Sequence, residues 1–243
     1  MASAAEVLLP LRPGLLPVPA IGQAGVCRFC HSACDPRYAQ CYPCLEAVQI
    51  VGAVEILPIA MSIDGGLLHR HLRGYKDDRS PAVRARMSRR LAALVAVFMD
   101  HHSACVGEFD SVVTVPSPTR AAVESIVSQV RVLGEQHRPA LGATGLGAKN
   151  DLQADRFALL RDVAGEHVLV VDDTFTRGPT LFSAVGALRE AGAVVVGPVV
   201  LGRHLRSGWG PSNDLLSWLS RRRWVEGRCC RCDGEVADGG RLL

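Results

Sequence analysis

Long apolar runs are missing from this sequence, and their absence argues against a membrane-spanning protein. The longest, Leu91–Met99 and Ala191–Gly202, fall well short of the roughly 20 residues that a membrane-spanning helix needs. The first residues also lack the basic lead of a secretory signal, and Pro10, Pro13 and Pro17 interrupt the apolar stretch there. We therefore expect a cytoplasmic protein with no membrane span.

An excess of charge of one sign is also lacking, since 27 Lys and Arg against 24 Asp and Glu leave a net charge of +3. Apolar residues make up 48% of the chain and charged residues 21%, which excludes a mainly disordered protein. The basic residues are unevenly spread, because segment 70–90 holds eight Lys and Arg against Asp77 and Asp78. Such a segment suits an anionic partner, either a phosphate-bearing small molecule or nucleic acid, or else it is a solvated helix face.

Nine cysteines in a cytoplasmic chain are not expected to form structural disulfides, because that compartment keeps thiols reduced. Four of them form two C-x2-C pairs separated by ten residues, namely Cys27, Cys30, Cys41 and Cys44. Thiolates at this spacing can surround one zinc ion. No polarising base or substrate cleft is evident nearby, so we expect a structural Zn²⁺ that lets a short segment with little core fold.

The roles of the other cysteines stay open at this stage. Cys229 and Cys232 form a third pair, which could replace one of the first two or complete a second site with Cys34 or His31. Cys105 follows a predicted helix, and we interpret it as a small packed residue rather than a nucleophile.

That helix is predicted to start at Pro81 with Ser80 as its N-cap. Its apolar residues recur at helical spacing on one face: Val83, Met87, Leu91, Leu94, Val95 and Phe98. At its carboxyl end, His101 and His102 are expected to complement the helix dipole.

Continuous apolar segments alternate with helical patterns in the middle of the chain, which indicates an α/β fold with a parallel sheet covered on both faces. We expect strands over 110–115, 167–171 and 193–201, one helix ending near Leu133, and another over 180–191. Segment 134–158 has little periodicity and is predicted to be a mobile loop with at most one short strand.

The expected organisation has four parts. They are a loosely ordered N-terminal arm (1–26), a small zinc-ribbon-like module (27–50), the sheet domain (51–205) and a C-terminal extension with the last cysteine pair (206–243).

The strongest chemical signal follows the strand 167–171, where Asp172 and Asp173 precede a turn and a helix. Open α/β sheets bind ligands at the carboxyl ends of their strands, and a helix N-terminus offers N–H groups to a phosphate. Thr176 and Thr180 add hydroxyl donors, and Gly178 allows a close backbone approach. Because carboxylates suit vicinal hydroxyls with or without Mg²⁺, this pattern predicts a ribose 5-phosphate site.

The segment VLVVDDTFTRGPTL (168–181) resembles the phosphoribosyl pyrophosphate motif of type I phosphoribosyltransferases. Together with the cysteine module, LRGYKD (72–77) and VTVPSP (113–118), it makes the chain similar to the ComF family, in particular to actinobacterial-like members. The resemblance covers roughly residues 27–205. It implies a type I phosphoribosyltransferase-like sheet, Mg²⁺-dependent binding of phosphoribosyl pyrophosphate and a role in DNA uptake during competence.

The resemblance also implies a role for individual residues. Asp172 and Asp173 would bind the ribose hydroxyls and stabilise positive charge at the anomeric carbon while a nitrogen nucleophile displaces pyrophosphate. The residues implied to hold the 5-phosphate are Thr174, Thr176, Arg177, Gly178 and Thr180. Ser117 and Arg120 would face the pyrophosphate.

Three departures from the family pattern favour a second hypothesis. Arg177 replaces a small hydroxyl residue, Pro179 removes an N–H donor, and the RGFNQ-like stretch is absent after Arg120. The alternative is a non-catalytic sensor or adaptor that binds phosphoribosyl pyrophosphate and contacts a competence-machinery protein or single-stranded nucleic acid.

Overall fold

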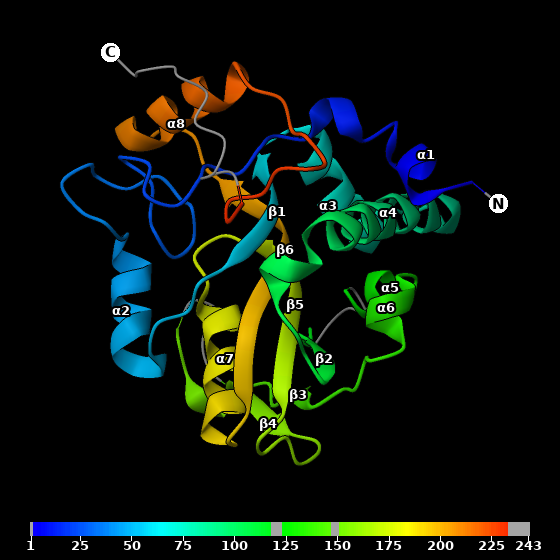
Figure 1. Ribbon diagram of the computed structural model, residues 1–243, viewed down its shortest axis with the longest axis vertical. Coiled ribbons are helices and arrows are strands. Elements are labelled where there is room, and N and C mark those ends of the chain that lie inside the picture. The colour runs from blue at the N-terminus through cyan, green and yellow to red at the C-terminus, as the bar shows by residue number, and fades with distance from the viewer. Residues whose placement is uncertain (1, 118–122, 147–150, 233–243) are drawn as a thin grey trace.

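The computed structural model describes residues 2–117, 123–146 and 151–232. Its centre is a parallel sheet of four strands in the order β1-β6-β5-β2 (Figure 1). These strands are β1 (Leu57–Ile63), β2 (Ser111–Thr114), β5 (His167–Phe175) and β6 (Val194–Leu205). A separate antiparallel pair consists of β3 (Leu141–Ala143) and β4 (Phe157–Leu159). The expected α/β class with a parallel sheet is confirmed.

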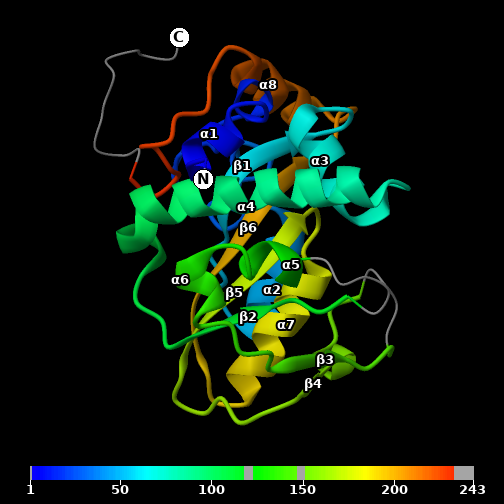
Figure 2. The same cartoon turned by 90° about the vertical axis from the view of Figure 1, so that its right-hand side faces the viewer.

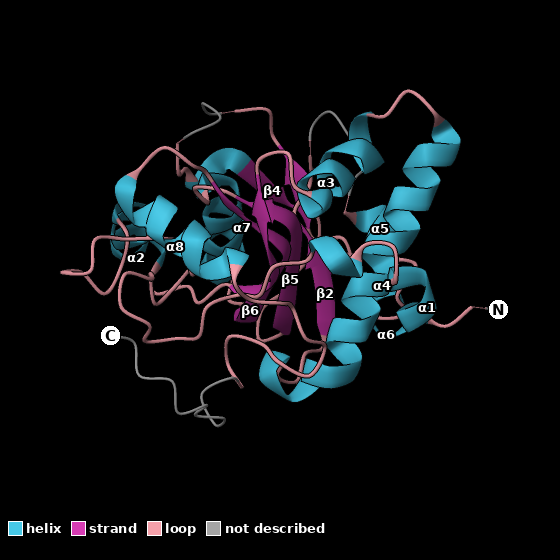
Figure 3. Ribbon diagram, turned by 90° about the horizontal axis from the view of Figure 1, so that it is seen from above, coloured by secondary structure: helices cyan, strands magenta, loops and turns pink. Residues whose placement is uncertain are grey.

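Helices cover both faces of this sheet, as the view from above shows (Figure 3). On one face lie α1 (Ala4–Leu8), α3 (Leu67–Asp77), α4 (Pro81–Val106), α5 (Glu124–Val127) and α6 (Arg131–Gly134). On the other face lie α2 (Tyr42–Val51) and α7 (Pro179–Glu190). The last helix, α8 (Gly210–Ser220), follows β6. Within the part of the chain that the structure describes, each helix is too short or too polar to cross a membrane.

The continuous apolar run in β5 is explained by burial on both faces. Leu169 and Val171 pack with α4, whereas Val168 and Val170 pack with α7, because side chains alternate along a strand. A strand with only one buried face would have alternated polar and apolar residues instead.

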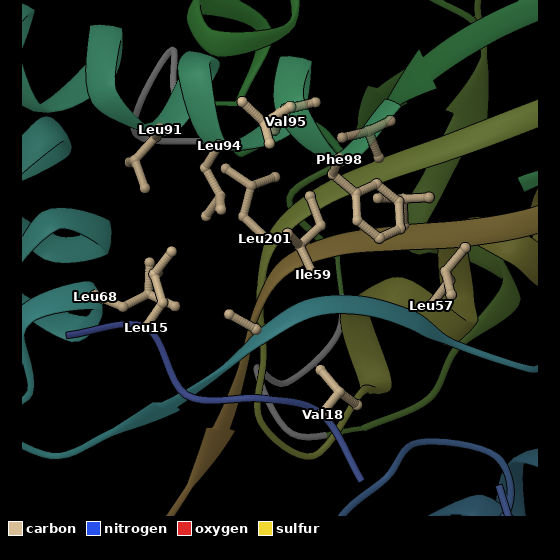
Figure 4. Packing of buried hydrophobic residues seen from close by; sticks show 14 of the residues in the cluster. Leu15, Val18, Leu57, Ile59, Leu68, Leu91, Leu94, Val95, Phe98 and Leu201 are labelled. Carbon is tan, nitrogen blue, oxygen red and sulfur yellow. The ribbon is translucent and has the colours of Figure 1, made fainter. Parts of the chain in front are cut away.

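Helix α4 begins as the sequence predicts, and it crosses one face of the sheet (Figure 2). The Ser80 hydroxyl accepts a hydrogen bond from the Val83 amide at 3.4 Å, and Pro81 occupies the first turn. The predicted apolar face packs against the sheet from its middle onward, with Leu91, Leu94, Val95 and Phe98 buried near Ile59 and Leu201 (Figure 4).

Two strands run further than predicted. β5 continues from Asp172 to Phe175, and β6 continues to Leu205, because the two strands stay paired to their ends. Asp is depleted in strands, so the two consecutive aspartates predict that the strand ends before them, but pairing with β6 overrides that preference. The two carboxylates therefore lie within a strand rather than after it.

The region between β2 and β5 also differs from the prediction. One helix was expected there, but Val130 adopts an extended conformation (φ −101°, ψ 105°) and separates α5 from α6. In the described part of segment 134–158, β3 pairs with β4, which starts at Phe157 and runs one residue past the segment, so a strand pair stands where at most one short strand was expected; residues 147–150 of the expected loop lie outside the described residues.

The N-terminal arm is packed rather than loosely ordered. Leu8, Leu11 and Leu15 are buried in the core beside α4, and Leu16 forms an antiparallel bridge with Met61 of β1. The arm thereby covers the outer edge of β1, whose backbone groups would otherwise be unpaired.

Candidate functional site

The chain diverges at the carboxyl ends of β5 and β2. Helix α7 follows β5 onto one face of the sheet, whereas α5 follows β2 onto the opposite face. In open parallel sheets this divergence leaves a crevice in which ligands bind.

A pocket of about 420 Å³ lies at the end of β5. It brings together six of the predicted residues: Asp172, Thr174, Thr176, Arg177, Gly178 and Thr180. Its other lining residues are Phe175, Pro179, Leu181 and Arg206. Ser117 is exposed shortly after β2, at the same edge of the sheet, whereas Arg120 lies outside the described residues.

Gly178 allows the turn between β5 and α7 to form. Its φ of 97° is in the left-handed region, which favours glycine. A Cβ atom there would lie 2.5 Å from ring atoms of Phe175 and of Phe182, whose rings pack edge to face. No larger residue fits this position without displacing an aromatic ring.

The N-terminus of α7 is open to this pocket. No side chain caps it, and Thr180 and Leu181 of its first turn line the pocket. The first N–H groups of a helix have no partner within the helix, and they carry the positive end of its dipole. Pro179 at the first position contributes no N–H, so the backbone donors of this turn start at Thr180.

The two neighbouring carboxylates have different surroundings because they alternate along β5. Asp172 lines the pocket, and its Oδ1 accepts a hydrogen bond from the Asp173 amide at 2.8 Å. Burial, and then the charge of Asp173, raise the pKa of Asp172 to about 7. A carboxyl group in this state is poised to lose its proton when a cation or a polarised hydroxyl approaches.

Asp173 is buried on the opposite side of β5, where helix α3 holds it. Its Oδ2 accepts a hydrogen bond from the Tyr75 hydroxyl and forms an ion pair with the Lys76 ammonium. Burial, reinforced by the charge of Asp173, raises the pKa of Tyr75, so the phenol stays protonated and can donate. The segment LRGYKD thus supplies the two residues that hold Asp173, a role that the residue types alone did not predict.

Only part of the basic segment 70–90 forms a charged surface. Lys76 turns inward to Asp173, while Arg70 and Arg84 donate to the backbone carbonyls of Gly65 and Asp78. The arginines of this segment that lie on the surface are Arg70, Arg73, Arg79, Arg86 and Arg89.

The sulfur atoms of Cys27, Cys30, Cys41 and Cys44 lie within 4.8 Å of one another. We call this group the N-terminal cluster. The sulfurs of Cys30 and Cys41 are 3.7 Å apart, and a tetrahedral zinc with bonds near 2.3 Å requires edges of about 3.8 Å. The four residues therefore have the donor type and the spacing that a zinc ion needs.

The alternatives left open by the sequence do not join this cluster. The thiol of Cys34 donates to the Tyr38 carbonyl at 3.3 Å, and burial raises its pKa to about 11. Nδ1 of His31 is 3.0 Å from the Pro19 carbonyl oxygen, and burial lowers the pKa of His31 to about 4. Neither residue lies beside Cys229 or Cys232, so the second site suggested with them is not formed.

Arg203 near the end of β6 connects the N-terminal cluster to the pocket. Its buried guanidinium donates to the Cys30 carbonyl at 2.8 Å and to the Phe175 and Thr176 carbonyls at 3.0 and 2.9 Å. One cation thus holds both the first cysteine pair and the turn that lines the pocket. Sequence reasoning missed it because β6 was predicted to end at Leu201.

Comparisons with known proteins show a likeness among solved structures. No protein-family model matches the chain, and a search of curated proteins finds no match either. Among solved structures, a phosphoribosyltransferase from Corynebacterium diphtheriae aligns with 53% of this chain and 82% of its own at 23% identity and a TM-score of 0.32. A score this low means that the two chains do not superpose as a whole.

Proposed function

We propose that this protein binds phosphoribosyl pyrophosphate together with Mg²⁺, holding its ribose 5-phosphate in the pocket at the end of β5. One observation carries the proposal: the pocket has the Asp172 carboxylate on one wall and the uncapped N-terminus of α7 on another. A phosphate dianion needs N–H donors and a positive dipole end, whereas ribose hydroxyls need an acceptor. The pocket offers both, a few residues apart.

Each ligand group has a candidate partner. The 5-phosphate would be held by the turn and by the first turn of α7, through Thr174, Thr176, Arg177, Gly178 and Thr180. Asp172 would accept from a ribose hydroxyl or bind Mg²⁺, since a hard carboxylate oxygen is a preferred ligand of this ion. Ser117 and Arg120 would face the pyrophosphate.

We further propose a phosphoribosyl transfer in which a nitrogen nucleophile displaces pyrophosphate from the anomeric carbon. Positive charge develops at that carbon, and the paired carboxylates Asp172 and Asp173 would stabilise it electrostatically. Lys76 and Tyr75 would keep Asp173 fixed, which limits reorganisation during the reaction. Bound Mg²⁺ would neutralise charge on the leaving pyrophosphate. No side-chain nucleophile is required.

A non-catalytic role is the second candidate, and Arg177 favours it. This exposed arginine lines the phosphate pocket, where its charge would strengthen anion binding without contributing to turnover. In that role the protein would sense phosphoribosyl pyrophosphate in the cytoplasm. The exposed arginines of segment 70–90 would contact single-stranded nucleic acid or a competence-machinery protein, in line with the ComF resemblance.

Both roles require binding of phosphoribosyl pyrophosphate. Calorimetry tests this binding by titrating the zinc-loaded protein with the ligand, with and without Mg²⁺. We expect micromolar, Mg²⁺-dependent binding that is lost in Asp172→Asn. Asp100→Asn, an exposed carboxylate on α4, is the matched control and should bind as the wild type does. Folded wild-type protein that does not bind would refute the proposal.

Two further measurements separate the roles. Pyrophosphate release in the presence of a panel of nitrogen bases would identify a transferase, whereas binding without release for every base would favour the sensor. Titration with single-stranded DNA at increasing salt tests the nucleic-acid partner, because multiple phosphate contacts make affinity fall steeply with salt. Absence of DNA binding at low salt would exclude that partner.

A further inference from the structure

Two segments that are far apart in the sequence meet at the carboxyl end of α4. His102 and Cys105 lie three residues apart on this end of the helix, and Cys229 and Cys232 form a C-x2-C pair in the C-terminal extension. The four candidate ligand atoms lie within 4.8 Å of one another. We call this group the C-terminal cluster. Cys105, expected to be a packed residue standing apart, and His102, expected to complement the dipole, both belong to it.

The spacing of these atoms approaches that of a tetrahedral metal site. The sulfurs of Cys229 and Cys232 are 3.3 Å apart, and the Cys232 sulfur is 3.5 Å from Nδ1 of His102. Around a zinc ion, edges of about 3.8 Å between two sulfurs and about 3.6 Å between sulfur and nitrogen are required. Only small side-chain shifts separate the cluster from that geometry.

His102 is oriented as a metal ligand. Its Nε2 lies 2.7 Å from the Glu226 carbonyl oxygen, which can only accept, so this nitrogen carries the hydrogen. The Nδ1 lone pair then points toward the Cys232 sulfur. A histidine that binds a metal through one nitrogen usually donates its other N–H to such a partner. The backbone at His102 leaves helical geometry (φ −130°, ψ 19°), as the ring reaches toward the extension.

The cluster also has a nearby positive charge. Arg231 donates to the Cys105 carbonyl at 2.6 Å and lies 3.6 Å from the Glu55 carboxylate. A divalent ion bound by three thiolates and one imidazole leaves one net negative charge, which the Arg231 guanidinium offsets in part because it is shared with Glu55. In addition, the Cys229 amide donates to the Cys232 sulfur at 3.3 Å, which lowers the cost of a buried thiolate.

We propose that His102, Cys105, Cys229 and Cys232 bind a second zinc ion. Soft thiolate and imidazole donors select zinc over Mg²⁺ and Ca²⁺, which prefer oxygen. Four protein ligands close the coordination sphere, so the ion is structural rather than catalytic. This site is independent of the pocket and of the function proposed for it.

The second zinc would fasten the C-terminal extension to the core. The Trp224 indole donates to the Ile59 carbonyl at 3.0 Å, and the Ile21 amide donates to the Cys230 carbonyl at 3.4 Å. The extension therefore runs beside β1 and the end of α4, where the red segment lies in Figures 1 and 2. A metal ion that links Cys229 and Cys232 to α4 would hold this cover over the edge strand.

Zinc content per chain tests the proposal directly. We expect two zinc ions per wild-type chain by elemental analysis and native mass spectrometry, and one in Cys229→Ser/Cys232→Ser. Cys230→Ala is the matched control, because Cys230 is a buried neighbour outside the cluster, and it should retain two. The proposal fails if the wild type holds one zinc ion, or if the double variant still holds two.

Cobalt substitution tests the proposal first on the wild-type chain and then on one conservative ligand variant. The wild type should bind two equivalents of Co²⁺ with distinct absorption spectra, one for four sulfurs and one for three sulfurs and a nitrogen. His102→Cys should keep both metals and convert the second spectrum into the four-sulfur type. A single equivalent, or a Cys229–Cys232 disulfide in protein purified under reducing conditions, would overturn the proposal.

Discussion

The two cysteine clusters offer similar ligands but are built in different ways. The N-terminal cluster comes from two C-x2-C pairs within 18 residues of chain, Cys27 to Cys44. The C-terminal cluster combines one such pair with His102 and Cys105, more than 120 residues earlier. A local cluster can organise a module that has little core of its own, whereas a long-range cluster joins parts of the chain that are already folded.

The surroundings of the clusters also differ. Arg203 donates hydrogen bonds to the backbone of Cys30 and to that of the turn that lines the pocket, so the N-terminal cluster is connected to the turn at which we propose that the ligand binds. The C-terminal cluster is linked through Arg231 and Glu226 to the extension and to the edge of the sheet. Loss of the zinc ion proposed for either cluster should destabilise the protein, but only its loss from the N-terminal cluster should affect the pocket.

The largest expected effect comes from removing each cluster in turn. Cys27→Ser/Cys44→Ser should unfold the module and abolish binding of phosphoribosyl pyrophosphate, because zinc sites of this type contribute on the order of 10 kcal/mol to folding. Cys229→Ser/Cys232→Ser should cost less, since Trp224 and Cys230 still anchor the extension, and should change the Kd by less than about threefold. Thermal unfolding and calorimetry measure both. Equal loss of ligand affinity in the two variants would contradict the comparison.

Arg203→Met should weaken ligand binding at the pocket without releasing the metal proposed for the N-terminal cluster. It removes the donor to the Cys30, Phe175 and Thr176 carbonyls, and a broken buried polar network typically costs about 3–5 kcal/mol. We expect at least a tenfold weaker Kd with the zinc content unchanged. Arg189→Met is the control, because Arg189 donates to the Val51 and Ala53 carbonyls away from the pocket and should leave the Kd unaltered. Unchanged ligand affinity in Arg203→Met would show that the link has no functional effect.

The features that the sequence predicted are local, and the features that it did not predict depend on long-range contacts. The N-cap of α4, the doubly buried strand β5, the turn into α7 and the N-terminal cluster all depend on residues close in sequence, and each was predicted. The extension of β5 through Phe175 depends on pairing with β6, which no local pattern reveals. The ligand set of the C-terminal cluster was missed because packing alone brings Cys105 to Cys229.

A substitution in the turn between β5 and α7 should perturb the pocket while leaving both clusters intact. Gly178→Ala places a Cβ atom 2.5 Å from two aromatic rings at a φ of 97°, so the strained backbone and overpacking should together cost about 2–4 kcal/mol. Gly165→Ala has a φ of 76° with nothing within 4 Å of the added atom, so it isolates the backbone cost of about 1 kcal/mol. Denaturant unfolding measures both, and the variants should retain both zinc ions. A similar cost at the two positions would show that the rings do not restrict the turn.

The smallest expected effect is a pH dependence that belongs to the pocket alone. Because burial raises the pKa of Asp172 to about 7, the carboxylate fraction grows about tenfold between pH 6 and pH 8, and Mg²⁺-dependent affinity should rise by a similar factor. Asp172→Asn, in which binding is expected to be lost, should show no measurable affinity at any pH in this range. In the absence of ligand, the sign reverses: the folded protein holds this proton more tightly than the unfolded chain, so the Asp172 contribution to stability falls as pH rises from about 4 to 7.

Cys229→Ser/Cys232→Ser should show the same pH dependence of binding as the wild type, because its lost metal has no contact with Asp172. A changed slope in that variant would mean that the C-terminal cluster communicates with the pocket after all.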